Sequence, residues 1–459
     1  MGGRRFLLCG AVVASPGVPL RSPGYVAVVD NRIYDVGEGT PPDTVYTSEW
    51  RRLDLSGCLI TPGLICTHHH LYQTITRGLA PDATLFEWLT TLYPLWAHLT
   101  PEMVEISSQA GLALLALSGC TTVADHAYLF PKDVDPFEWI QAEVAAAQRV
   151  GLRLYLARGA MDLGRSQGGL PPDEVVETID EALMRMAQAV KQLHDPKPDA
   201  HVRVALGPCS PFSASSQLYR ESARLARSLG VRLHTHLAET MDEEEYTRER
   251  FGVRPYAYVR SLGFDGPDLW VAHAVHLDEE EIAAFAEAGT SVAHCPTSNG
   301  RLGAGIAPVA QMMRGGVNVG LGVDGAASNE GAQMQAELHQ ALLFARAKEG
   351  PTALSTQEVL TMATLGGARC LGWEAEMGKL EPGMLADMAA WRIDSLTDSG
   401  IHDPLAAWVL GTPRAAEAVW VDGRPVVQSG RLVDLDMEVL ACELDTHSRR
   451  LLQAGGMMR

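Results

Sequence analysis

The sequence predicts an α/β fold: a (β/α)8 TIM barrel beside a small composite β-sandwich domain built from both chain ends. Between about residues 60 and 375, short apolar runs that end in polar residues alternate with helix-like segments. Eight such runs can be marked, as a closed barrel of parallel strands buried on both faces requires. The flanks instead alternate apolar and polar residues between proline and glycine turns, a pattern typical of hairpins.

The expected barrel strands are followed by helices whose ends carry the ordinary signals. Thr100 is a capping residue before a proline at the first helical position, and Ser355 and Glu358 have the spacing of a capping box. Gly230 and Gly289 stand where a helix should end before the next strand. The eight strands are expected at residues 59–70, 119–126, 152–161, 202–210, 231–239, 269–277, 291–299 and 317–326. The active site of such a barrel lies at the carboxyl ends of its strands.

The chain is expected to divide into three parts. Residues 1–59 and 376–434 would form the composite β-sandwich, residues 60–375 the catalytic barrel, and residues 435–459 a C-terminal helix. Two basic residues before the apolar residues 6–14 would also suit a signal peptide. Residues 25–30 follow as a natural hairpin partner, which favours a first β-strand instead.

Composition narrows the class of protein. Lys and Arg number 37 against 56 Asp and Glu, a formal charge of −19, and basic clusters are absent from the sequence. We therefore expect a small-molecule substrate, with neither nucleic acid nor a membrane as partner. The eight cysteines show no CxxC spacing, so we expect reduced thiols and a cytoplasmic protein.

Histidine placement points to the chemistry. Of 15 histidines, nine fall at or near the ends of predicted strands: His68, His69, His70, His126, His234, His236, His273, His276 and His294. A single histidine at a strand end is more often a satisfied core residue than a ligand. Nine that converge on one rim favour a metal site.

Strand geometry selects the ligands. Residues i and i+2 of a strand share a face, so His68 and His70 point together into the barrel. His236 at the end of the fifth strand can supply a third imidazole, and Asp324 at the end of the eighth can supply a carboxylate. Three imidazoles and one carboxylate suit Zn²⁺ or Fe²⁺ and do not suit Mg²⁺ or Ca²⁺.

These motifs resemble a known family. Residues 61–70 (TPGLICTHHH), residues 234–239 (HTHLAE), Ala272-His273 and Val323-Asp324 are strongly similar to the amidohydrolase superfamily, each on the expected strand and in the expected order. The resemblance covers essentially the whole chain, including the split small domain. It implies that His68, His70, His236 and Asp324 hold the metal, that Glu239 and His273 act on the water and the substrate, and that a homo-oligomer is to be expected.

The resemblance also implies one metal per subunit. Two-metal members use a bridging lysine from the fourth strand, but residues 202–209 contain none; the five lysines are Lys132, Lys191, Lys197, Lys348 and Lys379. A mononuclear site resembles that of aminohydrolases that deaminate nucleobases, with Zn²⁺ favoured and Fe²⁺ left open. The implied mechanism uses a metal-activated hydroxide. Asp324 accepts the proton of the water, His273 helps to orient it, and Glu239 protonates the ring nitrogen beside the attacked carbon.

Two residues bear on the substrate through this resemblance. Gln73 stands where guanine-deaminating relatives place a glutamine that reads the amide edge of the base. Cys209 stands where those relatives carry an arginine, which suits the acceptor N7 of guanine. An 8-oxidised purine carries N7–H, a donor that an arginine would oppose, so Cys209 fits an 8-oxidised base. His126 or His294 remains open as a replacement donor.

Longer runs give the expected reaction. Residues 69–77, 92–96, 169–172, 207–213 and 238–244 are similar to bacterial deaminases of 8-oxoguanine. The implied reaction is hydrolysis of 8-oxoguanine to urate plus ammonia. Isoxanthopterin deaminase, guanine deaminase and hydroxytriazine amino- or chlorohydrolase remain alternatives, and a non-catalytic scaffold is a remote one. Gly300 replaces a residue that is often bulky in this group, which leaves the size of the pocket open.

Other conspicuous residues receive structural interpretations. Residues 242–245 are expected to form a solvated helix start, and Trp88 and Tyr93 to pack within the long loop after the first strand. His234 and His276 are expected to be core residues or partners of the ligands.

Overall fold

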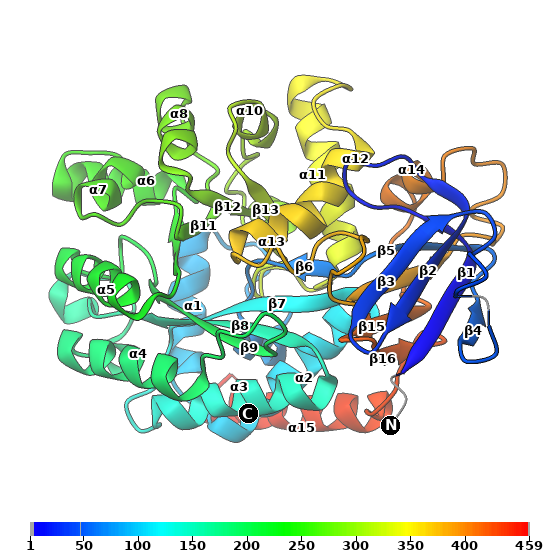
Figure 1. Cartoon of the computed structure of the whole chain (residues 1–459). Coiled ribbons are helices and arrows are strands. Elements are labelled where there is room, and N and C mark those ends of the chain that lie inside the picture. Colours follow the sequence, from blue (N-terminus) through cyan, green and yellow to red (C-terminus); the bar gives the residue numbers. More distant parts are fainter. Residues whose placement is uncertain (1–3, 46, 458–459) are drawn as a thin grey trace.

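The computed structural model describes residues 4–45 and 47–457. Eight parallel strands close into a barrel in the order β10-β11-β12-β13-β6-β7-β8-β9. These strands are β6 (Leu64–Cys66), β7 (Cys120–Ala127), β8 (Arg153–Ala160), β9 (Val202–Pro208), β10 (Leu233–Leu237), β11 (Leu269–His273), β12 (Ser291–His294) and β13 (Val319–Leu321). The predicted barrel is therefore confirmed (Figure 1).

Helices surround the barrel and cover its carboxyl end. The α-helices are α1 (Leu85–Trp96), α2 (Pro101–Leu117), α3 (Pro136–Val150), α4 (Ile179–Leu193), α5 (Ser216–Leu229), α6 (Met241–Phe251), α7 (Pro255–Ser261), α8 (Glu279–Ala288), α9 (Pro296–Arg301), α10 (Val309–Arg314), α11 (Met334–Glu349), α12 (Thr356–Thr361), α13 (Gly367–Cys370), α14 (Pro404–Leu410) and α15 (Met437–Ala454). Shorter turns are η1 (Leu71–Thr76), η2 (Arg165–Gln167), η3 (Asp173–Val175) and the π-helical η4 (Met362–Gly366). None of the helices in the described ranges is long and apolar enough to cross a membrane.

Both chain ends contribute to one further sheet, at the right of Figure 1. Its nine strands are β1 (Arg5–Val13), β2 (Arg21–Val29), β3 (Arg32–Glu38), β4 (Arg51–Asp54), β5 (Cys58–Pro62), β14 (Met388–Arg392), β15 (Ala418–Val421), β16 (Arg424–Gln428) and β17 (Arg431–Leu432). β1 pairs antiparallel with β2, the hairpin expected at the start of the chain. The sheet has an apolar core of its own, drawn from β1, β2, β14 and β15.

The first expected barrel run, residues 59–70, divides between the two sheets. β5 pairs with β14 of the flanking sheet, whereas β6 pairs with β7 and β13 of the barrel. Gly63 separates the two strands, and a Cβ at this position would lie 2.2 Å from Thr121 Oγ1. The histidines at 68–70 follow β6 rather than belonging to it.

The C-terminal helix α15 packs against α2 and η1. Leu440, Leu444 and Leu451 bury its apolar face, and the Ser448 hydroxyl donates to Ile75 O of η1 at 2.8 Å. The predicted β-sandwich and C-terminal helix also include residues 1–3, 46 and 458–459, which lie outside the described residues.

Candidate active site

The four expected ligands meet at the carboxyl end of the barrel. His70 Nε2 lies 3.0 Å from His236 Nε2, and Asp324 Oδ1 lies 3.4 Å from His68 Nε2 and 3.3 Å from His70 Nε2. Ligand atoms of His68, His70 and His236 all fall within 4.8 Å of one another. The side chains come from the ends of β6, β10 and β13, so the closure of the barrel brings them together.

Hydrogen bonds to carbonyl groups fix the tautomers of two of these rings. His70 Nδ1–H donates to His126 O at 2.9 Å, and His236 Nδ1–H donates to Cys209 O at 2.8 Å. Burial lowers the pKa of both imidazoles, so both rings are neutral and their facing Nε2 atoms carry lone pairs. Two lone pairs 3.0 Å apart, beside a carboxylate, are the donor set that a divalent cation requires. The residues present therefore fit a metal ion.

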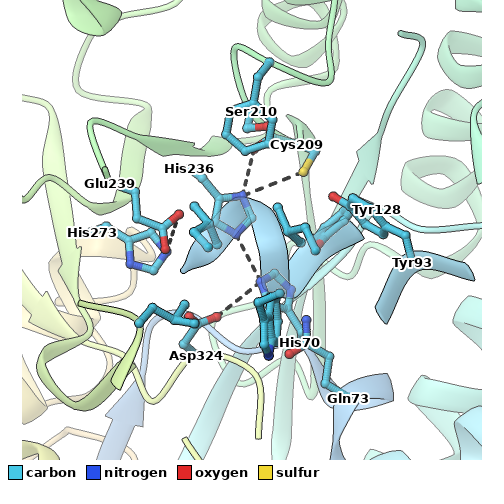
Figure 2. Close-up of a pocket in the computed structure, with 15 residues that line it drawn as sticks. His70, Gln73, Tyr93, Tyr128, Cys209, Ser210, His236, Glu239, His273 and Asp324 are labelled. Carbon is cyan, nitrogen blue, oxygen red and sulfur yellow. Dashed lines mark hydrogen bonds and ion pairs between the residues drawn. The ribbon is translucent and has the colours of Figure 1, made fainter. Parts of the chain in front are cut away.

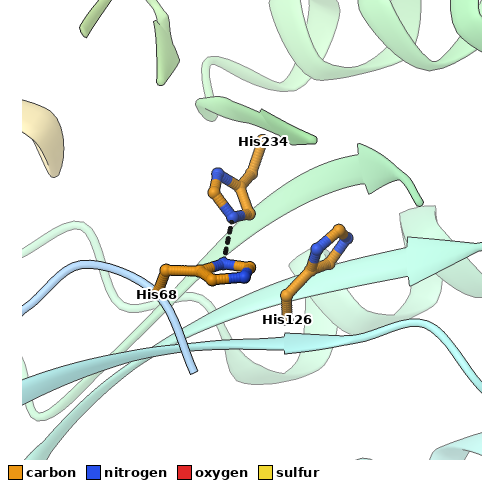
Figure 3. A group of neighbouring side chains, drawn as sticks. All are labelled: His68, His126 and His234. Atoms are coloured by element: carbon orange, nitrogen blue, oxygen red, sulfur yellow. Dashed lines mark hydrogen bonds between the residues drawn. The ribbon is translucent and has the colours of Figure 1, made fainter. Parts of the chain in front are cut away.

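A third histidine controls the ring of His68 (Figure 3). His234 Nδ1–H donates to Trp270 O at 2.8 Å, which leaves Nε2 of His234 as an acceptor. His68 Nδ1–H donates to that atom at 2.8 Å, so the lone pair of His68 is on Nε2. That Nε2 has no hydrogen-bond partner and lies on the side of Asp324. The group of His68, His126 and His234 is close enough to suggest a second cation site, but this hydrogen bond already uses the lone pair of His234.

Several site residues have positive φ angles, which residues other than glycine rarely adopt. φ is +62° at Asp324, +75° at His273 and +51° at Ala238, which precedes Glu239. Such left-handed conformations are costly and cluster at functional sites. Hydrogen bonds hold Asp324 in place, because the Ser298 hydroxyl donates to its Oδ2 at 2.6 Å and its own N–H donates to His68 O at 3.1 Å.

Glu239 and His273 form an acid–base pair beside the ligands. His273 Nε2 lies 3.7 Å from Glu239 Oε2, and its Nδ1–H donates to Asn299 Oδ1 at 2.9 Å. Burial raises the pKa of Glu239 to about 7. Burial alone would lower the pKa of His273, but the carboxylates of Glu239 and Asp324 outweigh it and raise that pKa. A carboxyl group with a pKa near neutrality can both donate and accept a proton.

A small cavity opens beside this pair (Figure 2). Glu239 and His273 lie on one side of the His70–His236 pair, and Tyr93 and Tyr128 lie on the opposite side. The remaining lining residues are Gln73, Leu85, Trp88, Leu89, Cys209, Ser210, Phe212, Leu302 and Asp324. Apolar and aromatic side chains therefore share the cavity with histidines, two carboxylates, Gln73 and Ser210.

The two residues expected to read the substrate both line this cavity. Gln73 is buried, its Oε1 has no hydrogen-bond partner, and its Nε2 is 3.4 Å from the Tyr72 hydroxyl. A Cβ at Gly325 would lie 1.8 Å from Gln73 Oε1, so the glycine after Asp324 gives the amide its place. Cys209 Sγ lies 3.9 Å from His236 Nδ1, and burial raises the pKa of its thiol to about 12. The thiol is neutral.

One structural interpretation from the sequence was wrong, another was incomplete, and one question that the sequence left open is answered. Trp88 and Tyr93 pack in the apolar core as expected, but they also line the cavity, because α1 folds over the carboxyl end of the barrel. Gly300 is exposed and does not line the cavity, so its lack of a side chain does not widen the pocket. Glu243, in the run expected to be solvated, is fully buried.

Other residues fall outside the cavity or were missed. Neither His126 nor His294, the open candidates for a replacement donor, lines it. Tyr128 was missed, although it lies two residues after His126 at a strand end and that spacing could have indicated it. Phe212 belongs to the run 207–213 that carried the resemblance, whereas Leu302 carried no signal in the sequence, because its place depends on how loops fold over the barrel.

Comparison with known proteins agrees with this geometry. The Amidohydrolase family matches residues 59–426. The chain is 43% identical over 424 residues to the 8-oxoguanine deaminase of Pseudomonas aeruginosa PAO1, covering 92% of this chain and 93% of the relative. It is 36% identical to an isoxanthopterin deaminase from an unknown prokaryotic organism, covering 95% and 93% of the two chains.

A solved structure shows the same architecture. The structure of atrazine chlorohydrolase TrzN from Arthrobacter aurescens TC1, complexed with zinc, superimposes with a TM-score of 0.90 at 32% identity, covering 96% of this chain and 100% of that one. The family and its deaminase and hydrolase members indicate a metal-dependent hydrolase that acts on C–N bonds. The chain belongs to the amidohydrolase family.

Proposed function

We propose that the protein hydrolyses 8-oxoguanine to urate and ammonia. The observation that carries this proposal is the wall formed by Cys209. Among the described residues that line the cavity there is neither an arginine nor a lysine, and the thiol at this position is neutral. The sulfur of Cys209 can accept the N7–H of an 8-oxidised purine, whereas the acceptor N7 of guanine would face a thiol, which is only a weak donor and a poor replacement for an arginine.

His68, His70, His236 and Asp324 would hold one divalent cation, with Zn²⁺ favoured by three imidazoles and one carboxylate and Fe²⁺ also compatible. A cation bound there supplies the nucleophile by lowering the pKa of a coordinated water to near neutrality. The neutral imidazoles and their fixed tautomers are what this chain contributes to that site.

The residues around the cation have separate tasks in the proposed reaction. Asp324 accepts a proton from the attacking water, and His273 orients that water through its Nε2 atom, which faces Glu239. Glu239 gives a proton to N3 of the purine while oxygen bonds to C2. Asp324 passes the proton that it took from the water to the amino group, the C2–N bond breaks, and ammonia leaves, while the remaining hydroxyl proton returns to Glu239. The new oxygen becomes the C2 carbonyl group of urate.

Gln73 would orient the base. Its free Oε1 can accept N1–H, and its amide nitrogen can donate to the carbonyl oxygen at C6. Tyr93 and Tyr128 close the opposite side of the cavity from Glu239. This arrangement presents C2 to the acid–base pair and the oxidised ring to Cys209.

Product analysis tests the proposal. Metal-loaded protein is incubated separately with 8-oxoguanine, guanine, isoxanthopterin and a hydroxytriazine, and both ammonia and the heterocyclic product are quantified. Equal amounts of urate and ammonia from 8-oxoguanine, with much less product from the others, would support the proposal. Faster ammonia release from isoxanthopterin or the hydroxytriazine would make that compound, and not 8-oxoguanine, the preferred substrate. No ammonia release from any of the four compounds would refute the proposed deaminase activity.

The proposed site of the reaction is the cytoplasm, since all eight cysteines are free thiols. Detection of the protein in the cytoplasmic fraction of its native cells would support this location, and recovery from the medium or an envelope fraction would contradict it.

A further inference from the structure

A buried carboxylate holds the loop that carries Glu239. Helix α6 begins at Met241, and Glu243 in its first turn points back along the chain. Glu243 Oε1 accepts the N–H of Ala238 at 3.0 Å, and Oε2 accepts the N–H of Glu239 at 2.9 Å. The side chain is fully buried. Both of its oxygens are therefore committed to two successive backbone groups of the active-site loop.

This loop requires outside support. β10 ends at Leu237, and Ala238 then adopts φ +51°, a left-handed conformation that is unfavourable for a residue with a Cβ. A strained turn persists only when the surrounding structure over-determines it. The bidentate contact with Glu243 supplies that constraint at the residue before Glu239 and at Glu239 itself.

Ordinary helix capping does not explain the contact. In α1, α4, α8 and α12 a glutamate at the third helical position accepts the N–H of the capping residue itself; these are Glu87, Glu181, Glu281 and Glu358. Glu243 also occupies the third position of its helix, whose capping residue is Thr240. It passes over the N–H of Thr240 and bonds the two residues before it. Glu243 therefore stabilises the loop before the helix and does not cap the end of its own helix.

We propose that Glu243 is a positioning residue that fixes the backbone of Glu239 so that its carboxylate faces the substrate and His273. The inference rests on the proposed function in one respect, the role of Glu239 as the proton donor. The contact places Glu239 Oε2 at 3.7 Å from His273 Nε2. A misplacement of about 1 Å in such a group can lower the rate about 10²-fold.

The consequence for catalysis is selective. Gln73 and Cys209, which would orient the base, follow β6 and β9, and the hydrogen bonds of Glu243 go to Ala238 and Glu239 and to neither of them. The metal ligands have their own hydrogen bonds to carbonyl groups. Loosening the loop should therefore lower kcat while KM and metal content stay near the wild-type values.

The test compares E243Q with E358Q. Glutamine keeps the shape of Glu243 but has one acceptor oxygen, so it can satisfy only one of the two N–H groups. E358Q makes the same change at an exposed capping-box glutamate that does not line the cavity. We expect kcat of E243Q to fall about tenfold to a hundredfold. Its KM and metal content should stay unchanged, and E358Q should keep the wild-type kcat.

A second readout needs no substrate. Hydrogen–deuterium exchange of the amides at 238 and 239 should be faster in E243Q than in the wild type and unchanged in E358Q. If E243Q does not fold, E243D keeps the buried charge and shortens its reach, and the same readouts apply.

The outcomes separate the two proposals. A wild-type protein that deaminates none of the heterocycles refutes the proposed function, and the exchange rates alone then decide whether Glu243 holds the loop. Unchanged exchange, or a wild-type kcat in E243Q, would overturn the inference. A rise of KM with constant kcat would also overturn it, because it would place Glu243 in substrate binding.

Discussion

At the residue scale, the direction of each hydrogen bond decides which atom of a side chain faces the cation and the substrate. The Nδ1–H groups of His70 and His236 are committed to carbonyl oxygens, so their Nε2 lone pairs are free. Identical residues with reversed tautomers would present N–H groups there and could not bind a cation. The backbone and His234 thus select the ligand atoms before any cation binds.

Glu239 gives the first prediction at this scale. E239Q removes the exchangeable proton but keeps the size of the side chain, so we expect turnover to fall about 10²-fold to 10⁴-fold. Metal content should be unchanged, since the four ligands are elsewhere. Steady-state ammonia release and elemental analysis check both parts, and near-normal turnover would remove Glu239 from the mechanism.

His234 gives the second prediction at the residue scale. In H234L the Nδ1–H of His68 loses its acceptor, so we expect metal affinity to fall about tenfold to a hundredfold. H234Q places an amide oxygen near the position of Nε2 and should lose less. Competition with a chromogenic chelator measures both affinities. Equal affinity of H234L and the wild type would show that the tautomer of His68 does not depend on His234.

At the scale of elements, one run of residues serves two sheets. β5 and β6 are continuous in sequence and were expected as one strand, but only Gly63 separates their different pairings. The residue lies so close to the Thr121 side chain of β7 that no Cβ fits at this position without a shift. The position of this change of sheet sets where β6 ends and hence where the histidine pair begins.

G63A tests this junction. Its new Cβ would lie 2.2 Å from Thr121 Oγ1, so the Thr121 side chain or the strands must shift, and we expect a destabilisation of about 1–3 kcal/mol. G331A is the matched control, because its Cβ would meet only Asn329 Oδ1 at 3.8 Å. Thermal denaturation should show a lower Tm for G63A and little change for G331A. An unchanged Tm in G63A would show that the junction between β5 and β6 accommodates a Cβ without loss of stability.

At the scale of the whole molecule, a buried ion network joins the barrel to the flanking sheet. Arg153 of β8 bonds Asp387 at 2.7 Å and Asp422 at 3.0 Å, both in the flanking sheet region, and also donates to Asp199 O and Ala200 O. Arg153 is fully buried. Removing one partner of a buried pair leaves the other charge uncompensated.

R153M should therefore lower the free energy of unfolding by about 3–5 kcal/mol. R392M, which breaks the exposed pair with Asp394 in the same sheet, should have little effect. Denaturant titration of both variants measures the difference. Equal midpoints would show that the network does not hold the two parts together.

The barrel and the meeting of the candidate metal ligands at its rim were predictable because both follow from periodic and local rules. Alternating strands and helices specify the barrel, and its topology places the ends of the strands on one rim, which identified His68, His236 and Asp324. Tertiary placement limited the rest. Glu243 lies in the first turn of α6, where a glutamate is commonly exposed to solvent, and its burial could not be read from that position. Trp88 reaches the cavity only because α1 covers the rim of the barrel. No local pattern distinguishes these outcomes.

The central claim is that the wall formed by Cys209 selects an 8-oxidised purine, and the ratio of kcat/KM for 8-oxoguanine to that for guanine tests it most directly. Both substrates are compared at saturating metal and the same pH. We expect 8-oxoguanine to be preferred by at least about 10²-fold, because a site that pairs a substrate's polar atom poorly rejects that substrate strongly and a thiol is a poor donor to N7 of guanine. A ratio near or below unity would contradict the account, since guanine would then be accepted as well without an arginine facing its N7.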